Sequence, residues 1–164
     1  MEELRAWLSR FSRLNNGVLD ARAVARSSTT SEDAVLGALL RGGPVLNPTA
    51  LKTIVIQSPG GLTKTLQRLE RAGHVRRVPD PADRRALLVE LTAKGRRAAV
   101  RAVDAVDAYY EELLADLDGT ERAQLGYLLR KVLDRLETLS GMPSDARIVS
   151  MLRRAEEQRT QPTN

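Results

Sequence analysis

The sequence predicts a mainly α-helical protein with one small β-hairpin. Apolar residues recur every three to four positions along most of the 164-residue chain, which is the spacing of one helix face. Aromatic residues make up only 3% of the chain, so the core must be built mainly of Leu, Val and Ala, a composition that favours helix. Between residues 74 and 91, strand-like alternation and a turn rich in Pro and Asp replace the helical spacing.

The composition excludes several kinds of chemistry. The chain has no cysteine and a single histidine, His74, so disulfides, thiol nucleophiles, Cys-zinc sites and His-rich metal sites are excluded. No apolar stretch reaches the roughly 20 residues that span a bilayer, and no N-terminal run resembles a signal peptide. The net charge of +5 suits a polyanionic partner. We therefore expect a cytoplasmic protein without a metal, a cofactor or a membrane contact.

Two helices are predicted in the N-terminal part. Residues 1–26 form the first, and the second begins with Thr30 and Asp33 as its cap and ends at the Gly-Gly-Pro run, 42–44. The second helix continues the apolar spacing with Val35, Leu36, Leu39 and Leu40. The first carries a longer apolar stripe, formed by Leu4, Trp7, Leu8, Phe11, Leu14 and Val18.

Two shorter helices follow, and both begin with the same signal. Asn47-Pro48 and Ser58-Pro59 each place a capping side chain before a proline at the first helical position. The second of these helices runs to about Ala72, because the glycine after it is a natural stop. Two short helices joined by a tight turn are the plan of a helix-turn-helix.

A hairpin follows this pair directly. Strand-like segments at 74–78 and 86–91 flank the turn PDPADRR. Long apolar helices are then predicted from Thr92 to about Leu117, then to Leu139, and again from Ser144, before a polar tail. Because the hairpin comes directly after the helix-turn-helix, it takes the place of a wing. The order predicts a winged helix-turn-helix domain with N- and C-terminal dimerisation helices.

The helix from Ser58 to Ala72 has the features of a major-groove reader. Leu62, Leu66 and Leu69 fall on one face, which must pack inward. Lys and Arg on the other face could reach guanine or phosphate, and Gln could pair with adenine. The alternative is an ordinary solvated surface. That face has no acid and carries Gly60, Lys64, Gln67, Arg68 and Arg71, flanked by Thr63 and Thr65.

Other residues of this helix suit phosphate. The hydroxyls of Ser58 and Thr63 could bond phosphate oxygens, and free N–H groups at a helix start attract phosphate. Gly60 and Gly61 weaken a helix, so two in succession indicate that the DNA backbone must come close there.

The hairpin tip carries two arginines. Arg84 and Arg85 follow Asp83, and a narrow minor groove attracts an inserted arginine. Asp83 could hold Arg85 in an extended rotamer and so lower the entropy lost on insertion. The alternative is a plain surface turn with a local ion pair.

Four sequence motifs strongly resemble the MarR family of bacterial regulators: NPTAL, SPGGLTKTLQRLERAGHVRR, DPADRRALLVELTAKGRR and LDGTERAQLGYLLRKVLDRL. The resemblance implies one domain over residues 1–158, with 30–91 as the winged helix-turn-helix, 1–26 and 92–158 as dimerisation helices, and 159–164 as a flexible tail. It implies a homodimer on a palindromic site. It also assigns base-reading or groove-inserting roles to Thr63, Lys64, Gln67, Arg68 and Arg85, and phosphate contacts to Ser58 and Arg84.

The same resemblance raises the question of an effector. Many family members release DNA when a small phenolic or aromatic acid binds. The SPGGLTK run looks like a urate-responsive branch that has a tryptophan near its ligand pocket. Trp7 and Phe11 are therefore candidate pocket residues, the alternative being plain core residues. His74 stands where the family usually has an apolar residue, so a pH-switch role and a partly exposed structural role are both open.

The dimer can also be argued from the residues alone. The helices outside the winged-helix unit carry apolar stripes that a chain this small has little left to cover, unless they fold back on their own domain. Pairing across a two-fold axis would set two groove-facing helices about 34 Å apart, one DNA turn. We expect a DNA-binding repressor. The alternative is a winged helix that docks a protein partner, and no motif of a hydrolase or nucleotide-binding enzyme is present.

Overall fold

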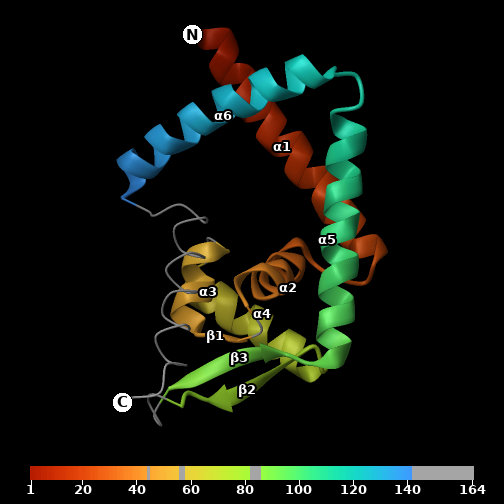
Figure 1. Ribbon diagram of the computed structural model, residues 1–164, viewed down its shortest axis with the longest axis vertical. Helices are drawn as coiled ribbons and strands as arrows, with labels where there is room; N and C mark the ends of the chain where they lie inside the picture. Colours follow the sequence, from red (N-terminus) through yellow and green to blue (C-terminus); the bar gives the residue numbers. More distant parts are fainter. Residues whose placement is uncertain (44, 56–57, 82–85, 142–164) are drawn as a thin grey trace, which may run out of the picture.

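The computed structural model describes residues 1–43, 45–55, 58–81 and 86–141. It confirms a mainly helical fold with a small antiparallel sheet (Figure 1). The helix predicted from Ser144 and the tail lie outside the described residues. The elements are α1 (Glu2–Ala25), α2 (Thr30–Gly42), β1 (Val45–Leu46), α3 (Pro48–Ile54), α4 (Pro59–Arg71), β2 (Val75–Pro79), β3 (Leu87–Leu91), α5 (Ala93–Leu113) and α6 (Gly119–Ser140).

Side-chain caps fix where three of the helices begin. The side chains of Asn47, Ser58 and Thr92 accept hydrogen bonds of 2.7, 3.1 and 2.9 Å from backbone N–H groups three residues on. These bonds satisfy N–H groups that have no partner inside the helix. The predicted cap-proline starts of α3 and α4 and the predicted cap of α5 are confirmed.

The predicted cap of α2 is wrong by one residue. Thr29 is the N-cap, and its side chain and that of Glu32 form a reciprocal capping box. Thr30, which was expected to cap, donates its hydroxyl to Asp20 of α1. Asp33 accepts from the α1–α2 turn instead, so both predicted capping groups are used to hold α1 against α2.

The sheet has one strand more than the sequence predicted. Its order is β1-β3-β2, with Val45 opposite Glu90 and Val75 opposite Leu91. The β2–β3 pair is the expected hairpin. β1 has only two residues, too few to show the alternation by which a strand is recognised in a sequence.

The core lies between α2 and the elements around it. Val35 and Leu39 of α2, Leu51 of α3, Leu69 of α4 and Val89 of β3 are the largest fully buried side chains. They belong to one cluster, to which α5 adds Ala99. Because α2 is in the middle, the positions of α4 and the hairpin are both set by contact with it.

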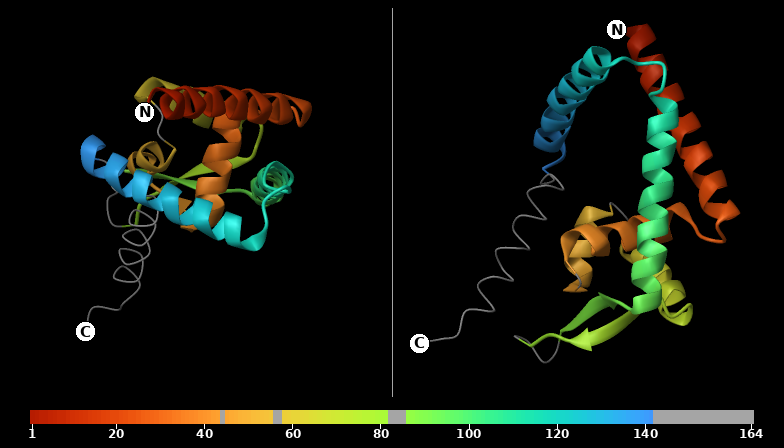
Figure 2. Two further views of the ribbon diagram at one scale, coloured as in Figure 1. Left: turned by 90° about the horizontal axis from the view of Figure 1, so that it is seen from above. Right: turned by 45° about the vertical axis from the view of Figure 1, so that its right-hand side comes forward.

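Three long helices extend beyond this core. α5 rises from the end of β3, α1 crosses beside it, and α6 turns back across the far end (Figures 1 and 2). Polar contacts join the first two: Tyr109 donates a 2.9 Å hydrogen bond to Asn15, and Arg22 forms a 2.7 Å ion pair with Glu112. Arg22 also lies over the ring of Tyr109. These contacts hold α1 against α5.

The apolar faces of α1 and α6 are uncovered in the single chain. α6 has no buried residue, and Trp7 of α1 is 65% exposed. Within the described residues, no helix has the length and apolar character that a bilayer crossing requires. The exposed large apolar residues of these two helices include Leu4, Leu8, Phe11, Leu14, Leu128, Leu129, Val132, Leu133, Leu136 and Leu139.

One glycine allows α5 to join the sheet. A Cβ built on Gly95 would lie 1.7 Å from the carbonyl oxygen of His74, which also accepts a 3.0 Å hydrogen bond from the N–H of Thr92. That oxygen belongs to the backbone and is held in place, so it cannot move away as a flexible side chain could.

We therefore expect Gly95→Ala to lower the free energy of unfolding by about 1–3 kcal/mol or more, as for an overpacked core. The measurement is urea unfolding followed by circular dichroism at a fixed protein concentration. Gly60→Ala is the matched control, since its Cβ meets nothing within 4 Å and it lies outside the apolar faces of α1 and α6. That change should be neutral or stabilise α4 by up to about 0.5–1 kcal/mol. Equal stabilities of the two variants would contradict the packing argument.

Candidate nucleic-acid interface

α4 is held with one face inward and the other in solvent, as the spacing predicted. Leu62, Leu66 and Leu69 are 4%, 4% and 2% exposed. The opposite face is formed by exposed residues that include no acid: Gly60, Thr63, Lys64, Gln67, Arg68 and Arg71. The structure therefore brings the predicted groove-facing residues of this helix onto one surface.

The start of α4 is open on one side. A Cβ on Gly60 would meet nothing within 4 Å, so another molecule has room to approach the first turn there. Gly61 is half-buried, and its N–H is bonded to the Ser58 hydroxyl. The prediction for Thr65 was wrong. It was expected to flank the exposed face, but it is 2% exposed and its hydroxyl donates a hydrogen bond to the Gly61 carbonyl. Its hydroxyl bonds within the helix, which allows it to be buried.

Ion pairs at both edges of α4 were missed by the sequence interpretation. Arg68 Nε lies 3.2 Å from Glu32 Oε1 of α2. On the other edge, Arg77 Nε of β2 lies 3.4 Å from Glu70 Oε2. A Thr-x-x-Glu capping box marks Glu32 as a fixed carboxylate, but its partner comes from the tertiary fold. Arg68 therefore has an acidic neighbour.

The hairpin presents its own charges. Arg76 and Glu90 are opposite each other across β2 and β3 and form a 2.7 Å ion pair. Asp80 is 5% exposed, and its backbone N–H donates to the Ala86 carbonyl at the base of the tip. The predicted tip residues Asp83, Arg84 and Arg85 lie outside the described residues.

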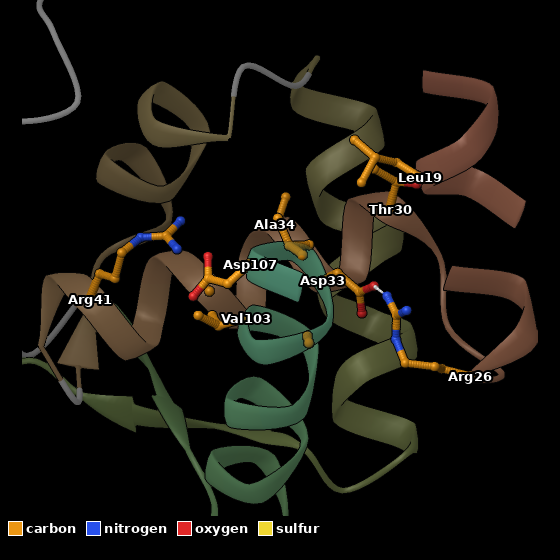
Figure 3. Close-up of a pocket in the computed structure, with 11 residues that line it drawn as sticks. Leu19, Arg26, Thr30, Asp33, Ala34, Arg41, Val103 and Asp107 are labelled. Carbon is orange, nitrogen blue, oxygen red and sulfur yellow. Dashed lines mark hydrogen bonds and ion pairs between the residues drawn. The ribbon is translucent and has the colours of Figure 1, made fainter. Parts of the chain in front are cut away.

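A cavity of about 190 Å³ lies between α1, α2 and α5 (Figure 3). Arg26 and Asp33 form a 2.6 Å ion pair at one end of it. At the other end, Arg41 of α2 and Asp107 of α5 point toward each other. Leu19, Ala34, Val103 and Val106 supply its apolar lining. The cavity thus combines an apolar middle with charged groups at both ends.

Two predicted ligand residues lie elsewhere. Trp7 and Phe11 are on the N-terminal half of α1, 65% and 54% exposed, and do not line this cavity. Their role at a ligand stays a prediction. Among the described residues, no group of three or more His, Cys, Asp or Glu side chains could hold a metal ion.

His74 lies where α4 ends and β2 begins. The backbone N–H of His74 donates a 2.8 Å hydrogen bond to the Leu69 carbonyl, and the imidazole side chain is partly buried. Burial, followed by the positive charge of Lys94, lowers the pKa of His74 from its ordinary value of 6.5. The negative charge of Glu32 raises this pKa, and the positive charge of Arg101 lowers it further.

Comparisons with known proteins agree with this geometry. A model of the MarR family matches residues 29–86. The transcriptional activatory protein BadR of Rhodopseudomonas palustris is 40% identical over 123 residues, covering 72% of this chain and 70% of BadR. A mutant of MarR from Escherichia coli, crystallised with operator DNA, matches with a TM-score of 0.69 and 30% identity over 80% of this chain and 94% of that one. BpsR of Bordetella bronchiseptica, whose DNA binding is regulated by 6-hydroxynicotinic acid, matches with a TM-score of 0.68 and 25% identity over 79% and 91%.

The lowered pKa of His74 makes a prediction about stability. The folded chain binds fewer protons near this pKa than the unfolded chain, so the free energy of unfolding should rise with pH until it levels off above 6.5. Below 6.5 this contribution is lost as pH falls toward the lowered pKa. His74→Gln should flatten the change below pH 6.5, because the chain has no other histidine. Urea unfolding at several pH values measures this, and an unchanged slope in the variant would refute it.

Proposed function

Because the chain belongs to the MarR family, we propose that it is a sequence-specific transcriptional regulator that binds double-stranded DNA through α4 and the β2–β3 hairpin. The observation that carries this proposal is the exposed face of α4, which has cations and an amide but no carboxylate. A major groove admits one such helix and presents acceptors and donors along its base edges. Opposite this face, buried leucines anchor the helix to the core.

Several residues at this surface have a proposed task. Lys64 reaches guanine or phosphate, Gln67 reads adenine, and Thr63 and the Ser58 cap contact the sugar-phosphate backbone. Gly60 supports this by leaving open space at the first turn, where backbone N–H groups also favour an anion. From the sequence, Arg85 enters the minor groove beside Asp83, and Arg84 contacts phosphate.

The molecule acts as a homodimer in this proposal. The apolar residues of α1 and α6 are exposed in one chain, and a second copy related by two-fold symmetry would cover them. Residues 1–26 and 92–158 then form the dimerisation part, and 30–91 form the DNA-binding part. A dimer places two α4 helices on successive turns of one duplex, which predicts a palindromic operator.

A small phenolic or aromatic acid is the proposed effector. The cavity has a volume of about 190 Å³, whereas pockets for drug-sized ligands have roughly 300 Å³ or more. The proposed ligand is therefore a small molecule with a single ring. Arg41 could hold the acid group while Val103 and Val106 contact a ring. A ligand there would contact both the DNA-binding part and the dimerisation helices. BpsR provides a relative regulated by an aromatic acid.

A protein-docking role for the winged helix is not favoured. The cores of protein interfaces are depleted in charged residues and rich in aromatic ones. The exposed face of α4 has the opposite composition, with Lys64 and Arg71 near its centre. Relatives of this chain are also named as transcriptional proteins, BadR as an activatory protein and HosA as a regulator.

Selection of bound genomic fragments, followed by sequencing, tests the proposed function. The proposal requires recovery of a palindromic motif, and the position of that motif relative to promoters separates repression from activation. Fragments without a shared motif, bound equally well at all salt concentrations, would contradict it.

Lys64→Ala should weaken binding to the recovered duplex about equally for related sequences and reduce the salt slope by about 1, if this lysine neutralises one phosphate. Fluorescence anisotropy over a series of salt concentrations measures both effects. Lys131→Ala on α6 removes the same charge away from α4 and is the matched control. Equal effects of the two changes would remove Lys64 from the interface.

Leu136→Glu should convert the dimer into a monomer. Leu136 is 57% exposed in the single chain, so the charge costs little there but would be buried between two copies. Size-exclusion chromatography with light scattering gives the mass, and circular dichroism checks that helix content is kept. A wild-type chain of monomer mass would contradict the dimer, whatever the variant does.

A further inference from the structure

Within the part of the chain that the structure describes, Arg68 of the cationic face already has an anionic partner. Its Nε lies 3.2 Å from Glu32 Oε1, and its Nη2 donates a 3.4 Å hydrogen bond to the Thr29 hydroxyl. Nε and Nη2 form the edge of the guanidinium that would otherwise make a two-point contact with a phosphate or a carboxylate. One hydrogen-bonding edge of the Arg68 guanidinium is therefore occupied by contacts inside the protein.

Glu32 cannot easily follow Arg68 outward. Its other oxygen, Oε2, accepts hydrogen bonds of 2.9 Å from the Thr29 N–H and 3.1 Å from the Thr29 hydroxyl. These bonds form the capping box of α2, and the Glu32 side chain is only 15% exposed. Moving the carboxylate would break the start of the central helix, so the pair is fixed from the α2 side.

The position of Arg68 on α4 agrees with such a pair. Thr65, three residues earlier, is buried, whereas Lys64 and Arg71 lie nearer the centre of the exposed face. Among the described residues, Lys64 has no carboxylate within ion-pair distance, in contrast to Arg68, which is half exposed beside one. The two cations are thus not equivalent, although the sequence alone makes them look alike.

We propose that Glu32 withholds Arg68 from DNA, so that Arg68 joins α4 to α2 instead of contacting phosphate. This inference rests on the proposed DNA-binding function. A guanidinium neutralised by a fixed carboxylate releases little counterion on binding DNA. If Arg68 moved to a phosphate, the carboxylate of Glu32 would be left partly buried, unpaired and close to the DNA. Glu32 is thus a positioning residue that sets how many cations α4 offers.

Glu32→Gln tests the inference, because glutamine keeps the capping box but removes the charge. The experiment measures affinity for the selected duplex against salt concentration for wild type, Glu32→Gln, Arg68→Ala and the double variant. Glu121→Gln is the matched control. Glu121 occupies the same position in the capping box of α6, so it changes the net charge equally without an arginine partner on α4. Circular dichroism and thermal unfolding check that each variant is folded.

We expect Glu32→Gln to bind about fivefold more tightly than Glu121→Gln, with a salt slope steeper by about 0.9, as for one additional phosphate contact. Arg68→Ala should change wild-type affinity by less than about twofold yet abolish the gain in the double variant. A Glu32→Gln variant that matches Glu121→Gln overturns the inference. A tenfold loss from Arg68→Ala in the wild-type background also overturns it, even if Glu32→Gln is poorly folded.

The failure of this inference can be told apart from failure of the proposed function. If the wild type binds the selected duplex and the variants behave as one of the two overturning outcomes, only the role of Glu32 is wrong. If the wild type binds no duplex at any salt concentration, the proposed function is wrong, and the inference about DNA falls with it.

Discussion

The packing of α4 against α2 is the constraint on which the candidate interface depends. Leu62, Leu66 and Leu69 occupy one side of α4 and are buried in the cluster centred on α2. Because successive residues of a helix are separated by about 100°, burying these three leucines fixes the direction of every other side chain. The exposed face is therefore a consequence of the core. A loss of packing beneath α4 would disturb DNA recognition without removing any contact residue.

The acids around α4 and the hairpin are arranged so that they subtract little from this face. Glu32, Glu70 and Glu90 each lie in an ion pair with an arginine. Such pairs near the surface contribute little to stability. Their larger effect is on the field, since a paired carboxylate repels an approaching polyanion less than a free one. Among the described residues, the cations outside these pairs then dominate the charge that a duplex would meet.

Local signals in the sequence were enough to predict most of this fold. Two cap-proline starts, a Gly after α4 and a Pro-Asp turn identify the helix-turn-helix and the hairpin because each depends on a few neighbouring residues. β1 escaped notice because its two residues take strand form only through pairing with β3. Thr29 was missed as the cap of α2 because four neighbouring residues also have suitable side chains: Ser27, Ser28, Thr30 and Ser31.

The sequence predicted the exposed face of the candidate site but not its tertiary contacts. Periodicity placed Lys64, Gln67 and Arg68 on one face, and this is what the structure has. Periodicity cannot show that Arg68 meets Glu32, since the two are 36 positions apart along the chain and come together only when α2 packs on α4. It likewise could not find the cavity, which needs residues from three separate helices.

In the proposed dimer, the bare apolar surface of α6 would tie the protein's stability to its own abundance. A folded form that exists mainly as a pair obeys mass action, so dilution weakens it and accumulation strengthens it. At low concentration, newly made chains would then have to pair before they persist. Gene dosage would then set the lifetime of the folded molecule as well as the number of molecules available to occupy an operator.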